Sequence, residues 1–60
     1  MNPTELDGQT IRIGRALKGL SQRKLGEMCG VRSWRIWALE NRVYEPRPEE
    51  VLKIWKVLST

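Results

Sequence analysis

Hydrophobic residues recur at helical spacing along this chain, and no segment shows the strict alternation of a half-buried strand. Glycines and prolines divide the chain into four short segments, at Gly8, Gly19, Gly30, Pro46 and Pro48. The predicted helices span residues 9–18, about eight residues between 21 and 30, residues 33–41 and residues 48–58. The sequence therefore predicts an all-α fold, a compact bundle of four short helices.

Local signals mark the ends of these helices. Ser21 is a good N-cap, because its hydroxyl can accept a hydrogen bond from a free backbone N–H of the first turn. Gly19 and Gly30 suit the left-handed backbone that commonly ends a helix. Pro48 fits a first helical turn, and the two glutamates after it favour the positive end of the helix dipole.

The third helix has a polarity that matters for function. On a wheel of 100° per residue, Ile36 and Leu39 mark the face toward the core, and Glu40 lies on the same side. Trp34 and Trp37 point largely away from that face. Exposed neighbouring tryptophans indicate either a binding surface or a contact with another helix or subunit.

Size and residue content exclude several classes of site. A chain of 60 residues forms one domain at most, and residues 1–8 are expected to be a flexible arm before the first helix. With no histidine and only Cys29, we expect no metal site, no cofactor, no disulfide and no enzymatic activity. Cys29 is expected to be a small core residue, in keeping with a cytoplasmic protein. No segment is apolar for long enough to predict a membrane span.

Positive charge is concentrated in the middle of the chain. The formal net charge is +4, yet residues 12–42 alone carry eight Lys/Arg against two acidic residues, a net of +6. Such a block indicates either a polyanionic partner or a solvated basic surface.

The second and third helices, joined by residues 30–32, form a helix-turn-helix pattern. The stretch GLSQRKLGEMCGV (residues 19–31), followed by Ile36 and by residues 39–41, closely resembles the Cro/CI-type (XRE) helix-turn-helix family. The resemblance covers about residues 9–58 without an insertion. It implies a lambda-repressor-like DNA-binding domain whose third helix enters the major groove of double-stranded DNA.

The resemblance also implies roles for individual residues. Arg15 and Glu40 match a pair that often forms a partly buried salt bridge, and Gln22 matches a residue that bonds a phosphate and supports the recognition helix. Contacts with bases or groove walls fall on Arg32, Ser33, Trp34, Trp37 and Ala38. The resemblance also places Gln22, and Asn41 with Arg42 beside it, near the DNA backbone. Phosphate contacts are expected as well from the charges of Arg23, Arg35, Arg42 and Arg47, each of which is either a phosphate contact or a solvated charge.

The sequence departs from the family pattern at several positions. Arg32 replaces the usual N-cap of the recognition helix, so either Ser33 caps the helix instead or the cap is lost and Arg32 reaches the DNA. Arg42 replaces a common glycine and adds charge near the DNA. Gly14 replaces a common leucine while Trp55 replaces a small residue, and we expect the Trp55 ring to fill the space over Gly14.

Together these features predict a sequence-specific transcriptional regulator of a bacterium or phage, most simply a cytoplasmic, nucleoid-associated repressor. One short helix reads few base pairs, so a homodimer on a palindromic operator is expected. Its interface would use the fourth helix, residues 43–47 or Trp37. The alternative is a protein-interaction module of the same fold, in which Trp34 and Trp37 contact a partner protein. No small-molecule ligand is expected, and the operator and the sign of regulation stay open.

Overall fold

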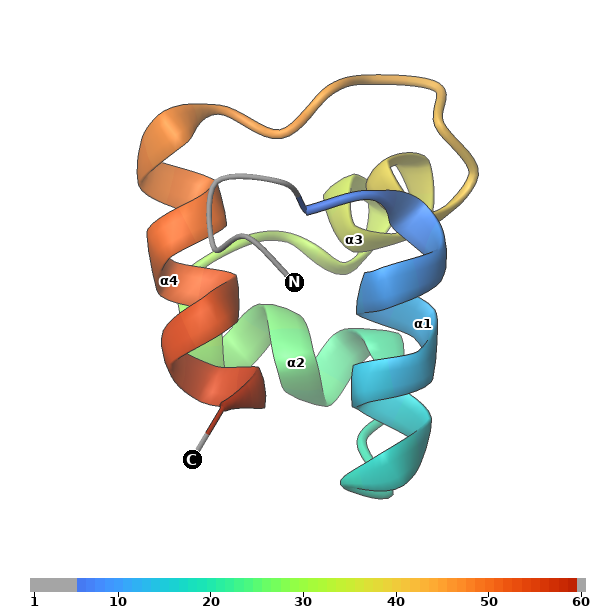
Figure 1. The fold of residues 1–60 in the computed structure, drawn as a ribbon, viewed down its shortest axis with the longest axis vertical. Coiled ribbons are helices and arrows are strands. Elements are labelled where there is room, and N and C mark those ends of the chain that lie inside the picture. Colours follow the sequence, from blue (N-terminus) through green and yellow to red (C-terminus); the bar gives the residue numbers. More distant parts are fainter. Residues whose placement is uncertain (1–5, 60) are drawn as a thin grey trace.

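The computed structural model describes residues 6–59, and the chain forms four α-helices over these residues (Figure 1). They are α1 (Gly8–Leu17), α2 (Gln22–Cys29), α3 (Ser33–Glu40) and α4 (Pro48–Leu58). No strand occurs in this part of the chain, which confirms the predicted all-α class. None of these helices is long and apolar enough to cross a membrane.

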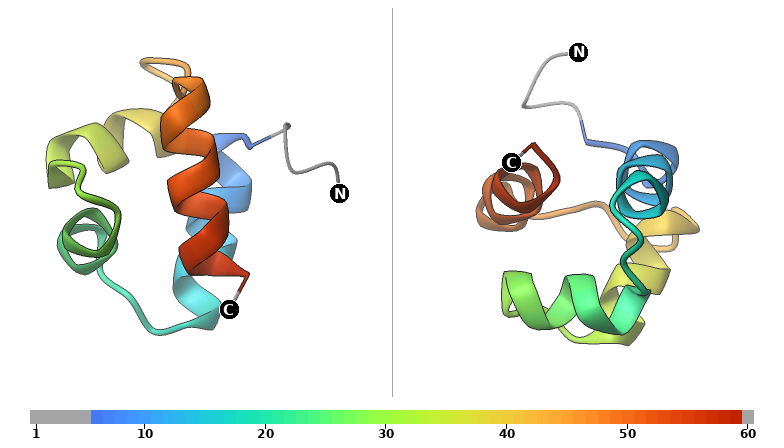
Figure 2. Two further views of the ribbon diagram at one scale, coloured as in Figure 1. Left: turned by 90° about the vertical axis from the view of Figure 1, so that its left-hand side faces the viewer. Right: turned by 90° about the horizontal axis from the view of Figure 1, so that it is seen from below.

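The helices enclose one small core. α1 and α4 stand beside each other, α2 crosses below them, and α3 packs against both α1 and α2 (Figures 1 and 2). Each helix supplies at least one fully buried aliphatic side chain, namely Ile11, Leu25, Ile36, Leu39 and Ile54. Cys29 is also buried, as expected for a small core residue, and burial raises the pKa of its thiol.

The predicted helix ends are confirmed at Ser21 and Gly30. Ser21 Oγ accepts a 2.9 Å hydrogen bond from the backbone N–H of Lys24, and Gly30 ends α2 with a φ of 70°. The start of α1 was not anticipated from the sequence. There Asp7 is the N-cap, and its Oδ1 accepts a 2.8 Å hydrogen bond from the backbone N–H of Thr10.

The predicted flexible arm is corrected for residues 6–8, whereas residues 1–5 lie outside the described residues. Leu6 is buried in the hydrophobic core, and Gly8 is the first residue of α1. A Cβ atom at Gly8 would overlap the carbonyl oxygens of Leu39 and Glu40. The start of α1 therefore lies directly against the end of α3, an approach that only glycine permits without a backbone shift.

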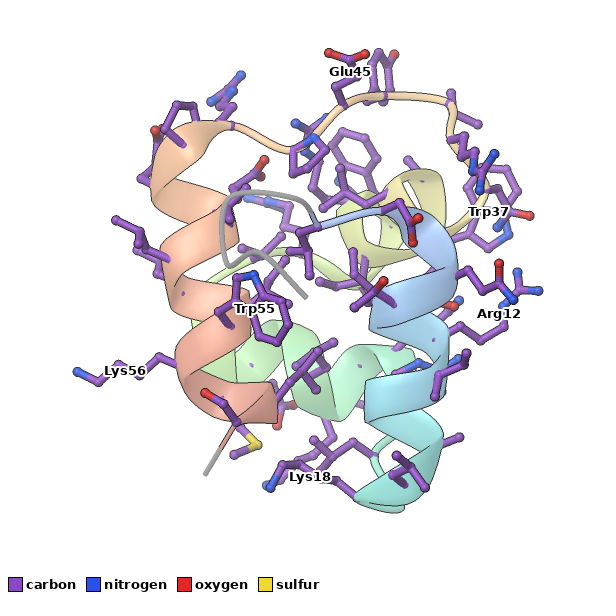
Figure 3. The ribbon with its side chains drawn as sticks, in the orientation of Figure 1. Arg12, Lys18, Trp37, Glu45, Trp55 and Lys56 are labelled. Atoms are coloured by element: carbon purple, nitrogen blue, oxygen red, sulfur yellow. The ribbon has the colours of Figure 1, made fainter. Side chains whose placement is uncertain are left out.

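The expected contact between Trp55 and Gly14 is wrong. The atoms nearest to a Cβ placed on Gly14 belong to Leu58, at 3.0 Å for Cδ1 and 3.3 Å for Cδ2. The residue of α4 that packs over Gly14 is therefore Leu58, which lies about one helical turn after Trp55. Trp55 is partly buried against the core and points from α4 toward the middle of the molecule (Figure 3).

Candidate nucleic-acid interface

A tight turn fixes α3 relative to α2. Gly30 adopts a left-handed backbone, and the N–H of Val31 donates a 2.8 Å hydrogen bond to the carbonyl of Gly26. A Cβ atom at Gly26 would overlap the carbonyl oxygen of Val31. The close approach of turn and helix makes α2 and α3 one rigid helix-turn-helix unit.

A buried carboxylate joins three of the helices. Glu40, at the end of α3, has a side chain only 1% exposed, and its two oxygens accept hydrogen bonds of 2.8 and 3.1 Å from Arg15 of α1. Gln22 of α2 adds a bond of 3.3 Å, and Arg12 lies 3.6 Å away. Arg15 also donates to the carbonyl of Leu20. The cluster holds α1 and the start of α2 against the recognition helix, as the resemblance implies for Arg15 and Glu40.

The environment of Glu40 favours its ionised form. Burial acts to raise the pKa of this carboxyl group. Hydrogen bonds from Arg15 and Gln22, with the charges of Arg15 and Arg12, outweigh burial, so the pKa lies below its ordinary value. The hydrogen bond to Glu40 also raises the pKa of Arg15. Glu40 is therefore charged at neutral pH, and Arg15 is its fixed counterion.

α3 presents two large aromatic side chains on its outer surface. Trp34 is 57% exposed and Trp37 is 50% exposed, as the helical wheel predicts. Trp37 lies at the outer edge of the molecule on the same side as Arg12 (Figure 3). Asn41 caps the end of α3, because its Nδ2 donates a 2.9 Å hydrogen bond to the Trp37 carbonyl. The exposed face of α3 therefore combines apolar rings with polar ends.

Basic side chains flank this face. Arg23, Arg32 and Ser33 line an open depression between α2 and the start of α3. Arg23 is 84% exposed, with Glu27 3.4 Å away. Arg32 occupies the N-cap position of α3 without a side-chain cap bond, so the alternative in which Ser33 caps the helix is wrong. The side chain of Arg32 is thus left exposed at the end of α3.

Two further arginines follow α3. Arg42 is exposed and has a φ of 58°, so it keeps the left-handed geometry that glycine would adopt more easily at this position. Arg47 is the N-cap of α4, where its backbone N–H donates a 2.8 Å hydrogen bond to Glu50 Oε1. Its side chain is exposed. Both guanidinium groups are accessible to a polyanion.

The structure corrects two of the expected DNA contacts. Arg35 is turned inward, where its guanidinium binds both carboxylate oxygens of Glu50 at 2.9 and 3.0 Å and the carbonyl of Glu45 at 3.2 Å. Its side chain is only 13% exposed, so its role is to join α3 to α4 rather than to bind phosphate. Ala38 is 1% exposed, and the chain after α3 turns back so that the N–H of Val43 donates a 2.9 Å hydrogen bond to the Ala38 carbonyl. Ala38 therefore cannot touch a base in this conformation.

Sequence reasoning missed two members of this surface. Arg12 adds an exposed positive charge beside Glu40, although the sequence gave it no role beyond the basic block. Tyr44, whose place could not be decided from the sequence, lies against Trp34 and Arg35. Within residues 6–59 no three His, Cys, Asp or Glu side chains are grouped so that they could hold a metal ion.

Comparison with known proteins gives two matches of different kinds. A family model described as helix-turn-helix matches residues 11–60. The solution structure of the DNA-binding domain of the P22 C2 repressor superposes with a TM-score of 0.85 at 37% sequence identity. The match covers 98% of this chain and 76% of that domain. No curated protein matches the chain. Sequence and fold are thus similar, over nearly the whole chain, to those of a repressor domain.

Proposed function

The chain belongs to the helix-turn-helix family of DNA-binding regulators, and from this premise we propose that it is a sequence-specific repressor whose α3 enters the major groove. The observation that carries this proposal is the exposed face of α3. Two half-exposed tryptophans lie there between basic side chains, while Glu40 and Arg35 hold the helix from behind. A face that is rigid, apolar and bordered by positive charge suits a groove between two rows of phosphates.

The structure supports a division of roles on this surface. Indole rings can pack on thymine methyl groups, whereas guanidinium and amide groups suit bases or phosphates. We assign the groove contacts to Arg32, Ser33, Trp34 and Trp37. We assign the phosphate contacts to Gln22, Arg23, Asn41, Arg42 and Arg47.

We further propose that two copies bind a palindromic operator. An α3 of eight residues reaches only a few base pairs, and each good base contact discriminates by about 1–3 kcal/mol. Two half-sites about one helical turn apart would multiply this discrimination.

Selection of bound sequences from a pool of random duplexes tests this proposal. We expect a palindromic consensus. On that duplex, Arg23, Arg42 and Arg47 are expected to neutralise three phosphates per protomer, so log K should fall with log[salt] at a slope of about −2.7 per protomer. A titration by fluorescence anisotropy at several salt concentrations measures the slope. A salt-independent affinity, or no enriched sequence, would contradict the proposal.

Arg42→Gly is expected to raise the free energy of unfolding and to lower the affinity for DNA. Glycine adopts the φ of 58° at this position without strain, so the free energy of unfolding should rise by up to about 1 kcal/mol. The loss of one phosphate contact should reduce the salt slope by about 0.9. Urea unfolding and anisotropy measure the two effects. If stability rises while the salt slope is unchanged, Arg42 does not contact phosphate.

A second function rests on the same two tryptophans. Large exposed aromatic residues are typical energetic centres of protein–protein interfaces. In this alternative, the fold serves as an interaction module, and Trp34 and Trp37 bind a partner protein instead of DNA. The tryptophan variants considered in the Discussion separate the two functions.

A further inference from the structure

We propose that Tyr44 is a positioning residue that orients the Trp34 ring for reading DNA. Tyr44 lies in the loop between α3 and α4 and is not itself assigned a DNA contact. This inference rests on the function proposed for α3 and adds to it a residue that sets specificity indirectly.

Tyr44 contacts two side chains of α3, one of which is exposed on the face proposed to enter the groove. Its ring meets Trp34 edge-on, with 6.4 Å between ring centroids and 75° between ring planes. The guanidinium carbon of Arg35 lies 5.2 Å from the centre of the same ring. Both geometries are favourable, since aromatic edges and cations are attracted to the face of an aromatic ring. Tyr44 thus touches two successive residues of the recognition helix.

Arg35, which lies against the Tyr44 ring, is itself fixed in position. It is held by two hydrogen bonds to Glu50, the third residue of α4, and by one to the Glu45 carbonyl. The side chain of Glu45 itself points outward from the loop (Figure 3). Glu50 in turn accepts the backbone N–H of Arg47. Glu50 of α4 therefore fixes Arg35, and Arg35 fixes the Tyr44 ring. Because Tyr44 contacts Trp34, the position of Trp34 depends on a helix outside the helix-turn-helix unit.

Trp34 needs such support more than Trp37 does. It is the second residue of α3, where the N-cap Arg32 provides no side-chain bond. Trp37 lies nearer the other end of α3, and its carbonyl accepts bonds from both the backbone and the side chain of Asn41. The first turn of α3 lacks a comparable cap, and the Trp34 ring is 57% exposed. The contact with Tyr44 therefore limits which rotamers the ring can adopt.

Burial alone does not explain where Tyr44 lies. The side chain is 53% exposed, the same fraction as its neighbour Val43. Val43 lies in the segment expected at a dimer interface, so it does not serve as the control. Ile13→Ala is the control instead, because Ile13 is 51% exposed on α1, outside the helix-turn-helix unit and the expected dimer interface.

The test compares Tyr44→Ala, Tyr44→Phe and Ile13→Ala on the selected duplex and on a scrambled duplex at one salt concentration. Tyr44→Ala should weaken binding to the selected duplex by about 3- to 10-fold, the range of an aromatic pair. Binding to the scrambled duplex should change less than 2-fold. Tyr44→Phe keeps the ring and Ile13→Ala leaves Tyr44 in place, so both should bind like the wild type. Circular dichroism and thermal melting verify that each variant is folded.

A double-mutant cycle with Trp34→Ala decides whether Tyr44 acts through Trp34. In the Trp34→Ala background, Tyr44→Ala should cost less than 2-fold, because no ring is left to position. If the losses are additive, or if Tyr44→Ala binds like the wild type, the inference is wrong and the proposed function stands. If the wild type binds the selected and the scrambled duplex equally, both the role of Tyr44 and the proposed function are wrong.

Discussion

Replacing Glu40 with glutamine is expected to lower the free energy of unfolding by about 3 kcal/mol at pH 7. The substitution keeps the shape of the side chain but removes the charge to which Arg15 donates two hydrogen bonds. The Glu40 side chain is 1% exposed and that of Arg15 is 20% exposed, so water replaces the lost partner poorly. A domain of this size has about 3–9 kcal/mol of total stability, so the loss is a large fraction of it.

Glu27→Gln is the matched control for this prediction. Glu27 also pairs with two cations, Arg23 and Lys24, but its side chain is 55% exposed. Exposed pairs contribute about 0–1 kcal/mol, so this variant should melt in urea almost like the wild type. Similar losses for Glu27→Gln and Glu40→Gln would show that the buried cluster has no special role.

The same cluster predicts how stability responds to acid. The pKa of Glu40 is lowered as described above, and hydrogen bonds from Arg35 lead the causes that lower the pKa of Glu50. A carboxyl group with a lowered pKa in the folded state stabilises the protein above its ordinary pKa of about 4.5. That stabilisation is lost as the pH falls through the lower folded-state value. Glu40→Gln should therefore show a weaker loss of stability below pH 4.5 than the wild type.

The helices and their capped ends could be predicted because their signals are local. Ser21 accepts a hydrogen bond from Lys24, three residues further along the chain, so the sequence alone shows the donor and the acceptor. Gly30 adopts the left-handed backbone that ends a helix, and the residue type alone indicates this conformation. The exposed faces of Trp34 and Trp37 follow equally from the 100° period of a helix.

The contacts of Arg35, Ala38 and Gly8 depend on how the helices pack together. A helical wheel describes one helix and gives no information about its neighbours. On the wheel Arg35 lies at the edge of the core face of α3, as Glu40 does, but only the packing of α4 shows that Glu50 is its partner. Ala38 lies opposite Ile36 on the wheel, yet it is 1% exposed in the folded chain. The start of α1 was missed for the same reason, because Gly8 is required by the carbonyls of α3.

Trp34→Ala and Trp37→Ala are each expected to weaken binding to the selected duplex by about 10- to 100-fold. A good base contact is worth about 1–3 kcal/mol, and every 1.4 kcal/mol corresponds to about tenfold in affinity. Both rings are at least half exposed, so the free energy of unfolding should change by less than about 1 kcal/mol. Anisotropy titrations measure the affinity, and urea melts verify the fold.

Leu17→Ala is the control for these losses. Leu17 is 83% exposed on α1, so its removal takes away exposed apolar surface from a helix that is proposed neither to enter the groove nor to form the dimer interface. This variant should bind the selected duplex like the wild type. The two functions then give opposite results. In a repressor, Trp34→Ala and Trp37→Ala lose DNA affinity and Leu17→Ala does not. In an interaction module, all three variants bind duplex DNA equally, and only the tryptophan variants lose a protein partner, because the rings would contact protein rather than bases.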